Sequence, residues 1–206
     1  IIPGFPFITS GIDLAKLDMR SGMERLMYAL IIILVATMAA WIMALLLHLK
    51  PVDFIKMSMP VEMWILLRLI ASFCGVFGFS VMFNSPARLA TMAALIGAVA
   101  NTLRLELVDL AGMPPAVAAF IGALTAGIFA SLIKNKAGYP RISLTVPSIV
   151  IMVPGLYLYR GIYNLGMMSL SVAASWFAAA ILIIAALPLG LIFARILTDR
   201  TFRYCT

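Results

Sequence analysis

The chain has 206 residues, of which 64% are hydrophobic and only 11% are charged, and its formal net charge is +7. This composition excludes an ordinary water-soluble fold and predicts an all-α integral membrane protein. The basic residues lie in short gaps between apolar runs, so they indicate membrane orientation, and no nucleic-acid partner is expected. The two cysteines, Cys74 and Cys205, fit neither a disulfide framework nor a metal motif.

A Pro-Gly pair interrupts apolar sequence twice, first at Pro3 and Gly4 and again at Pro154 and Gly155. A Gly-Ile pair follows each copy, with a spacing that differs by one residue between the copies. Duplicated helix breaks are typical of inverted-repeat transporters, which place substrate sites at interrupted helices near the membrane midplane. The alternative is that two such pairs coincide by chance in an apolar chain that contains several prolines.

Apolar and charged residues alternate over residues 13–26, directly after the first break. This pattern predicts an amphipathic helix on the membrane surface, interrupted near Ser21 and Gly22. A solvated linker without function is the alternative.

Charge-free runs of suitable length predict six membrane crossings after that segment. The third crossing is short and requires Arg88 and Arg104 to extend toward the two membrane surfaces, and Arg68 is expected to do the same. The last crossing leaves room for tilt or a kink at Pro188. The predicted crossings are Leu26–Leu49, a run from about Glu62 to Arg88, Leu89–Leu103, Leu110–Ile133, a broken crossing over Ile142–Tyr159, and Leu165–Ala194.

Six crossings place the N-terminal segment and the C-terminal tail on one side, which we predict to be cytoplasmic because it receives most of the basic residues. If residues 142–159 formed a re-entrant loop, the C-terminal tail and its basic residues would lie on the other side of the membrane. The excess of basic residues on one side would then be lost. An odd number of crossings lies between the breaks, so the two Pro-Gly segments are predicted to run in opposite directions. Residues 1–60 would end a first membrane repeat, and residues 61–206 would form a second. The basic residues on the predicted cytoplasmic side are Lys16, Arg20, Arg25, Arg88, Lys134, Lys136, Arg141, Arg195, Arg200 and Arg203.

The second break offers free carbonyls and a half-helix N-terminus, which favours a carboxylate. Arg160 follows closely enough to bind that carboxylate in a bidentate manner, with Tyr157, Tyr159 and Tyr163 as hydroxyl partners. These same side chains would also suit an aromatic and basic belt at the membrane interface.

The first break is followed by the polar residues Thr9, Ser10 and Asp13, and we predict that Pro3, Gly4, Thr9 and Ser10 contact the substrate. Asp13 is the nearest carboxylate to either break, so we predict that it carries protons or contacts a substrate amino group. Its alternative role is that of a helix N-cap.

Small residues recur at helical spacing in the third and fourth crossings and predict close helix packing. Asn101 lies in line with them at membrane depth, where it either bonds across helices or faces a substrate path. The small residues are Ala90, Ala94, Gly97, Gly122, Ala123, Ala126 and Gly127.

No enzymatic pattern is present in the sequence. It contains one histidine and no HExxH, CxxC, GxSxG or Walker-type motif, and its carboxylates are scattered. We therefore expect no enzymatic activity, no metal and no cofactor.

Three stretches resemble the threonine/serine exporter family: residues 3–14, residues 83–101 and residues 147–161. They contain, in order, Pro3-Gly4-Phe5-Pro6, Phe83-Asn84-Ser85-Pro86 and Val153-Pro154-Gly155. The resemblance spans essentially the whole chain. It implies a carrier of two five-span halves that exports small amino acids, driven by the proton motive force. Some relatives divide the halves between two polypeptides and are associated with export of succinate-like dicarboxylates.

The sequence therefore predicts a multi-pass secondary exporter of the bacterial inner membrane, with lipid and a small carboxylate-bearing substrate as partners. Threonine and serine are the expected substrates, and homo-oligomerisation is left open. The alternatives are a dicarboxylate exporter, a passive channel and a membrane subunit that does not itself transport.

Overall fold

The computed structural model describes residues 3–48 and 59–199, without the side chains of 134–137, and all regular structure in these ranges is helical. Five helices are long and apolar enough to cross a membrane, and α6 with α7 forms a sixth crossing if this pair, bent by 41°, counts as one. The polytopic helical fold is as predicted, and a helix break lies at Pro154 and Gly155. The bent pair fits both a broken crossing and the re-entrant alternative. The helices are α1 (Gly4–Ala15), α2 (Met19–Leu46), α3 (Val61–Met82), α4 (Ala87–Asp109), α5 (Pro115–Ala137), α6 (Arg141–Val150), α7 (Gly155–Gly166) and α8 (Leu170–Thr198).

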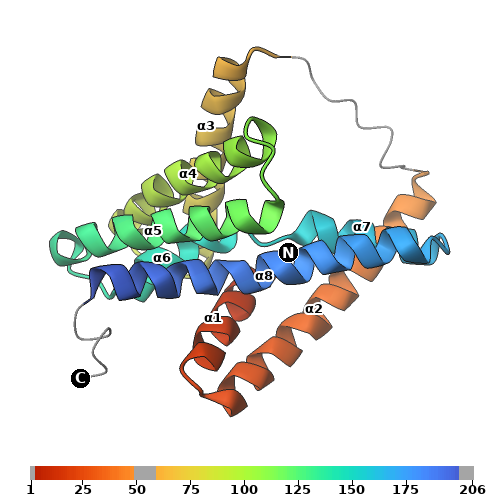
Figure 1. The fold of residues 1–206 in the computed structure, drawn as a ribbon, viewed down its shortest axis with the longest axis horizontal. Coiled ribbons are helices and arrows are strands. Elements are labelled where there is room, and N and C mark those ends of the chain that lie inside the picture. Colours follow the sequence, from red (N-terminus) through yellow and green to blue (C-terminus); the bar gives the residue numbers. More distant parts are fainter. Residues whose placement is uncertain (1–2, 49–58, 200–206) are drawn as a thin grey trace.

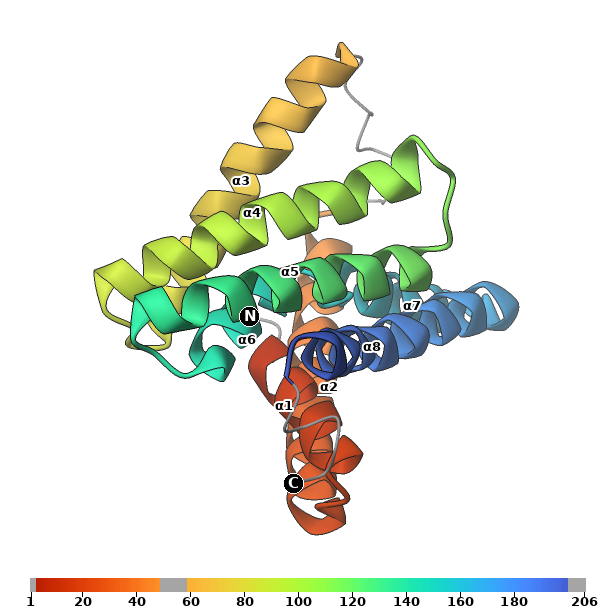
Figure 2. The ribbon, with the colours of Figure 1, turned by 60° about the vertical axis from the view of Figure 1, so that its left-hand side comes forward.

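Helices α4, α5, α6 and α8 supply most of the buried core, and Ile8 of α1 joins it. Figure 2 shows α5 lying between α4 and α8. Small residues allow this close approach, since a Cβ atom on Gly190 of α8 would lie 2.6 Å from the carbonyl oxygen of Phe120. A Cβ atom on Gly127 would lie 2.5 Å from the Cβ atom of Ala194. The predicted packing role of the small residues in the fourth crossing is therefore confirmed.

Helix α4 packs on α6 through Gly97, where a Cβ atom would lie 2.8 Å from the carbonyl oxygen of Ser148. The helix then continues to Asp109, so the third crossing is longer than the predicted Leu89–Leu103. It can extend because the two carboxylates near its C-terminal end are paired within the protein. Arg68 of α3 donates to Glu106 at 2.7 Å and also pairs with Asp109. The extension of Arg68 to the membrane surface stays a prediction, and within the protein Arg68 joins α3 to α4.

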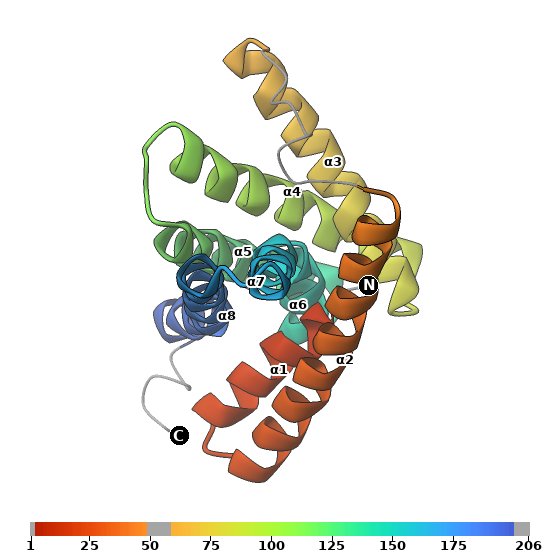
Figure 3. The ribbon, with the colours of Figure 1, turned by 90° about the vertical axis from the view of Figure 1, so that its right-hand side faces the viewer.

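Two helical hairpins, α1–α2 (Figure 3) and α7–α8 (Figure 1), share one backbone plan. Each short helix has 12 residues and begins on the glycine of a Pro-Gly pair, and the long helices have 28 and 29 residues. Each turn contains a residue with positive φ, Leu17 at 64° and Met168 at 59°. The Pro-Gly pair, the positive-φ residue and the start of the long helix each lie the same number of positions apart between the first hairpin and the second. The two hairpins therefore align without a gap. The Gly-Ile pairs fall one position out of this alignment and are not equivalent.

The segment 13–26 is interrupted before Met19 and not, as predicted, near Ser21 and Gly22, while its place at the membrane surface stays a prediction. Helix α1 ends at Ala15, the chain turns, and α2 starts at Met19 and continues through Gly22. Asp18 caps α2 by accepting a hydrogen bond from the Ser21 amide. Gly22 permits close contact between the helices, because a Cβ atom there would lie 2.7 Å from Leu14 Cγ. A glycine that looked like a helix breaker is therefore a packing residue.

Helix α8 is continuous through Pro188, which lies against Gly11 of α1. The charge-based prediction of sidedness rests in part on residues outside the described ones, and it stays a prediction. Those residues are Lys50, Lys56, Arg200 and Arg203, together with the side chains of Lys134 and Lys136.

Candidate functional site

The two Pro-Gly breaks lie in contact. A Cβ atom on Gly4 would lie 3.0 Å from Val153 Cγ2 and 3.3 Å from the carbonyl oxygen of Val150, and Pro3, Pro154 and Gly155 are buried with them. Helices α1 and α7 therefore begin next to one another and leave in different directions (Figure 1). Because the first amides of a helix lack partners within it, both helix starts bring positive partial charge to this place.

Arg104 of α4 extends to the second break. Its Nη1 donates to the carbonyl oxygen of Met152 at 2.8 Å, and its buried Nε has no hydrogen-bond partner among the described residues. Among the described residues, no carboxylate lies within ion-pair distance of Arg104. A charged side chain within a membrane-spanning helix is costly without a counter-charge, so such a group indicates a functional site.

Asn101 and Tyr157 lie close to this arginine. Asn101 is buried one turn before Arg104, and its Nδ2 donates to Ser72 Oγ at 2.8 Å. Its Oδ1 is buried and without a hydrogen-bond partner in the described residues. Tyr157 lies within electrostatic range of Arg104. We call Asn101, Arg104, Met152 and Tyr157 the break site, since together they offer a cation, an amide and a hydroxyl group beside a freed carbonyl.

Arg160 points toward α8 and not toward the break carbonyl. Its guanidinium lies over the ring of Trp176, 4.8 Å from the centroid, and Tyr157 meets the same ring edge-on at 5.4 Å. Tyr159 and Tyr163 form a separate ring pair at 6.3 Å. They are one turn apart, and Tyr159 is two residues from Tyr157, so the pair lies on another side of α7. Of the three tyrosines predicted to bind substrate, Tyr157 is the one near Arg104.

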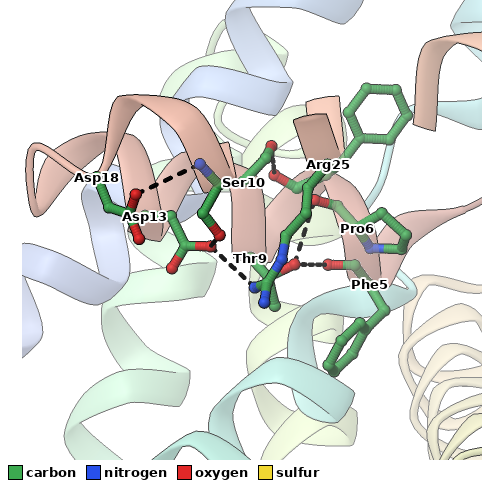
Figure 4. A network of polar contacts seen from close by, with 9 residues as sticks. Phe5, Pro6, Thr9, Ser10, Asp13, Asp18 and Arg25 are labelled. Carbon is green, nitrogen blue, oxygen red and sulfur yellow. Dashed lines mark hydrogen bonds and ion pairs between the residues drawn. The ribbon is translucent and has the colours of Figure 1, made fainter. Parts of the chain in front are cut away.

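The polar residues of α1 are not gathered at the break (Figure 4). Thr9 and Ser10 are buried, and their hydroxyl groups donate to carbonyl oxygens of their own helix, those of Phe5 at 3.0 Å and Phe7 at 2.8 Å. Asp13 lies near the far end of α1, about 14 Å along the helix from Gly4 at 1.5 Å per residue. There it pairs with Arg25 of α2 at 2.8 Å. Since Asp13 lies inside α1, the N-cap alternative is wrong.

Arg104 is the residue that the sequence analysis assigned to a different role, that of reaching a membrane surface. A signal was present, because Gly97, Asn101 and Arg104 follow one another at helical spacing on one face. Once Gly97 and Asn101 are placed inward, Arg104 must also point inward.

The family described as "Threonine/Serine exporter, ThrE" matches residues 68–197, more than half of the chain. The chain belongs to the threonine/serine exporter family. A second family of threonine/serine exporters matches residues 1–47. The chain is therefore a membrane-spanning protein of a transporter family associated with amino-acid export, and the family is not one of enzymes. No curated protein and no solved structure matches the chain.

Proposed function

We propose that this protein exports threonine and serine across the bacterial inner membrane, driven by the proton motive force, and holds the substrate carboxylate at the break site. The observation that carries the proposal is Arg104, a cation within a membrane-spanning helix of an amino-acid exporter family, directed at the carbonyl of a helix break. A carboxylate would supply its missing counter-charge and accept a hydrogen bond from Nε.

The repeat supports the same mechanism. We propose that residues 1–60 end one membrane repeat and that residues 61–206 form a second, inverted one. The gap-free equivalence of the two hairpins and the contact between Gly4 and Val153 support this arrangement. A substrate between the breaks would then face one half-helix from each repeat.

Transport of radiolabelled threonine and serine by the chain in proteoliposomes tests the function. We expect saturable transport of threonine and serine that responds to an imposed pH gradient. Succinate is tested in parallel. Transport of succinate alone would support the dicarboxylate alternative. Non-saturating flux without response to the gradient would indicate a channel, and absence of any flux would contradict the exporter.

Substitution of arginines by lysine tests the site, because lysine keeps the charge but cannot form a bidentate contact. Arg104→Lys should reduce transport about 10- to 100-fold, the equivalent of one or two charged hydrogen bonds. Arg160→Lys should have a smaller effect, since Arg160 stacks on Trp176. Arg88→Lys, at an exposed position of the same helix, is the control. Normal transport by Arg104→Lys would show that the substrate carboxylate does not bind at Arg104.

Asp13 remains our proposed proton carrier, now through its ion pair with Arg25 at the far end of α1. Asp13→Asn should preserve exchange of unlabelled for labelled threonine while the response to a pH gradient is lost. Retention of that response would exclude Asp13 from coupling.

A further inference from the structure

Asn101 contains a buried hydrogen-bond acceptor that the surrounding helices do not use. The residue is 5% exposed, and its Nδ2 donates to Ser72 Oγ of α3 at 2.8 Å. This bond fixes the orientation of the amide, so Oδ1 is directed away from Ser72. Oδ1 is buried, and no group in the described part of the chain donates to it. Because a buried acceptor without a partner is costly, such an atom indicates a place where a ligand donates a hydrogen bond.

This acceptor lies beside the second break. Helix α4 lies between α3 and α5 (Figure 2). Gly97 precedes Asn101 by about one turn on the same face of α4, and a Cβ atom there would lie 2.8 Å from the Ser148 carbonyl oxygen in the last turn of α6. Helix α3 reaches the same place, because a Cβ atom on Gly75 would lie 2.7 Å from Ile151 Cδ1. Asn101 is therefore located where α3, α4 and the end of α6 converge.

Asn101 and Arg104 are neighbours on one face of α4. Residues three positions apart on a helix have Cβ atoms about 5–6 Å from one another. Since Arg104 Nε is also buried without a partner in the described ranges, an unused donor and an unused acceptor lie one turn apart. In a hydroxy amino acid, only Cα and Cβ separate the carboxylate from the hydroxyl group. A single molecule can therefore present its carboxylate to Arg104 and its hydroxyl group to Asn101.

The chemistry of the Asn101 amide favours a hydroxyl group over an ammonium group as the donor. An ammonium group carries a full charge and forms its strongest hydrogen bonds with a carboxylate. The amide oxygen is a neutral acceptor, and the nearby guanidinium of Arg104 disfavours a second cation. A hydroxyl group donates without bringing charge, so it matches the amide oxygen.

We propose that Asn101 selects substrates with a side-chain hydroxyl group, by accepting a hydrogen bond at Oδ1 while Arg104 holds the carboxylate. Valine has nearly the shape of threonine but leaves Oδ1 unpaired, and alanine does the same in place of serine. A site that pairs with a hydroxyl group rejects an analogue without it more strongly than a site that only encloses it. The inference rests on the proposed function, because it requires the substrate carboxylate at Arg104.

Calorimetric titration of the purified chain in nanodiscs tests the proposal, with threonine, valine, serine and alanine as ligands. Wild type should bind threonine about 10-fold more tightly than valine, the equivalent of one hydrogen bond, and should prefer serine to alanine in the same way. Asn101→Leu keeps the size of the side chain and should abolish both preferences. Ser72→Ala is the matched control, since it removes the same hydrogen bond between α3 and α4 but keeps Oδ1. Its preference for threonine should persist.

Several results would overturn the inference. Equal affinity of wild type for threonine and valine is the most direct, and this comparison does not depend on the folding of any variant. An unchanged preference in Asn101→Leu would exclude Oδ1 as its source. Loss of the preference in Ser72→Ala as well would assign it to the contact between the helices. Absence of binding by all four amino acids would overturn the inference together with the break site.

Transport measurements separate this inference from the proposed function. Preferential binding of threonine without any flux in proteoliposomes would contradict export and leave the selection by Asn101 intact. Saturable transport of threonine and valine with equal efficiency would support a transporter and contradict the selection alone.

Discussion

The hairpins α1–α2 and α7–α8 have equivalent backbones but are held together by different chemistry. In the first, Arg25 of α2 forms an ion pair with Asp13 of α1. In the second, the position equivalent to Arg25 is Trp176, which contacts Tyr157 and Arg160 of α7. The equivalent of Asp13 is Asn164, whose side chain donates to the Arg160 carbonyl oxygen. One backbone plan thus places a titratable carboxylate in one hairpin and an aromatic and cationic contact in the other.

This difference separates the roles expected of the two hairpins. An ion pair with a carboxylate responds to protonation, whereas a cation over an indole ring does not require a second charge. The first hairpin therefore contains the chemistry that the proposed proton coupling requires. The second lies beside Arg104 through Tyr157 and is suited to substrate contact.

The largest effect is expected where a glycine sets the distance between the helices of a hairpin. Gly22→Val should destabilise the protein by about 2 kcal/mol, because the new side chain meets the Leu14 side chain and its backbone nitrogen. Gly161→Val should cost less, since the three heavy atoms nearest to its Cβ position all belong to the side chain of Phe177 and none to the backbone. Thermal unfolding in detergent, followed by helical circular dichroism, measures both. Gly78→Val is the control, as nothing lies within 4 Å of its Cβ position. Equal effects at Gly22 and Gly78 would contradict the hairpin contact.

An intermediate effect is expected when the first hairpin receives the chemistry of the second. Asp13→Asn should lower stability by about 1 kcal/mol at neutral pH, a modest value because the Arg25 side chain is 50% exposed. A double-mutant cycle with Arg25→Gln isolates the pair, and most of the loss should disappear in the Arg25→Gln background. Additive losses would show that the two side chains do not interact.

The smallest effect is expected at the aromatic contact of the second hairpin. Trp176→Phe keeps an aromatic ring but weakens the cation–π contact with Arg160, at a cost of about 0.5 kcal/mol. The same thermal unfolding measurement detects this as a small shift in midpoint. The shift should vanish in an Arg160→Gln background, and a shift of unchanged size there would exclude the cation–π contact as its cause.

The sequence predicted features that follow from local chemistry. The spacing of charges located the apolar crossings, and Pro154 with Gly155 located the break, because proline lacks an amide hydrogen and disrupts the helix. The turn between α1 and α2 was misplaced, since it uses Leu17, a residue type with no preference for positive φ, whereas the nearby Gly22 resembled a breaker.

The role of Arg104 depended on tertiary structure. From the sequence it lies at the end of a short apolar run, where long basic side chains commonly reach the membrane surface. In the fold, Glu106 and Asp109 neutralise Arg68 and allow α4 to continue, so Arg104 lies alongside the break and not beyond it. Pairing between distant helices is not encoded in the local pattern of either one.

Helix α6 fixes the separation between Arg141, at its N-terminal end, and the break. Its 10 residues correspond to about 15 Å, roughly half of a hydrocarbon core about 30 Å thick. An anion that moves from one end of α6 to the other would therefore cross about half of the membrane's electric field. Since a full crossing is worth about 2.3 kcal/mol per charge at 100 mV, that step alone would cost or release about 1 kcal/mol per charge. If α6 runs along the membrane normal, the length of this one short helix sets how strongly occupancy of the break by an anion depends on voltage.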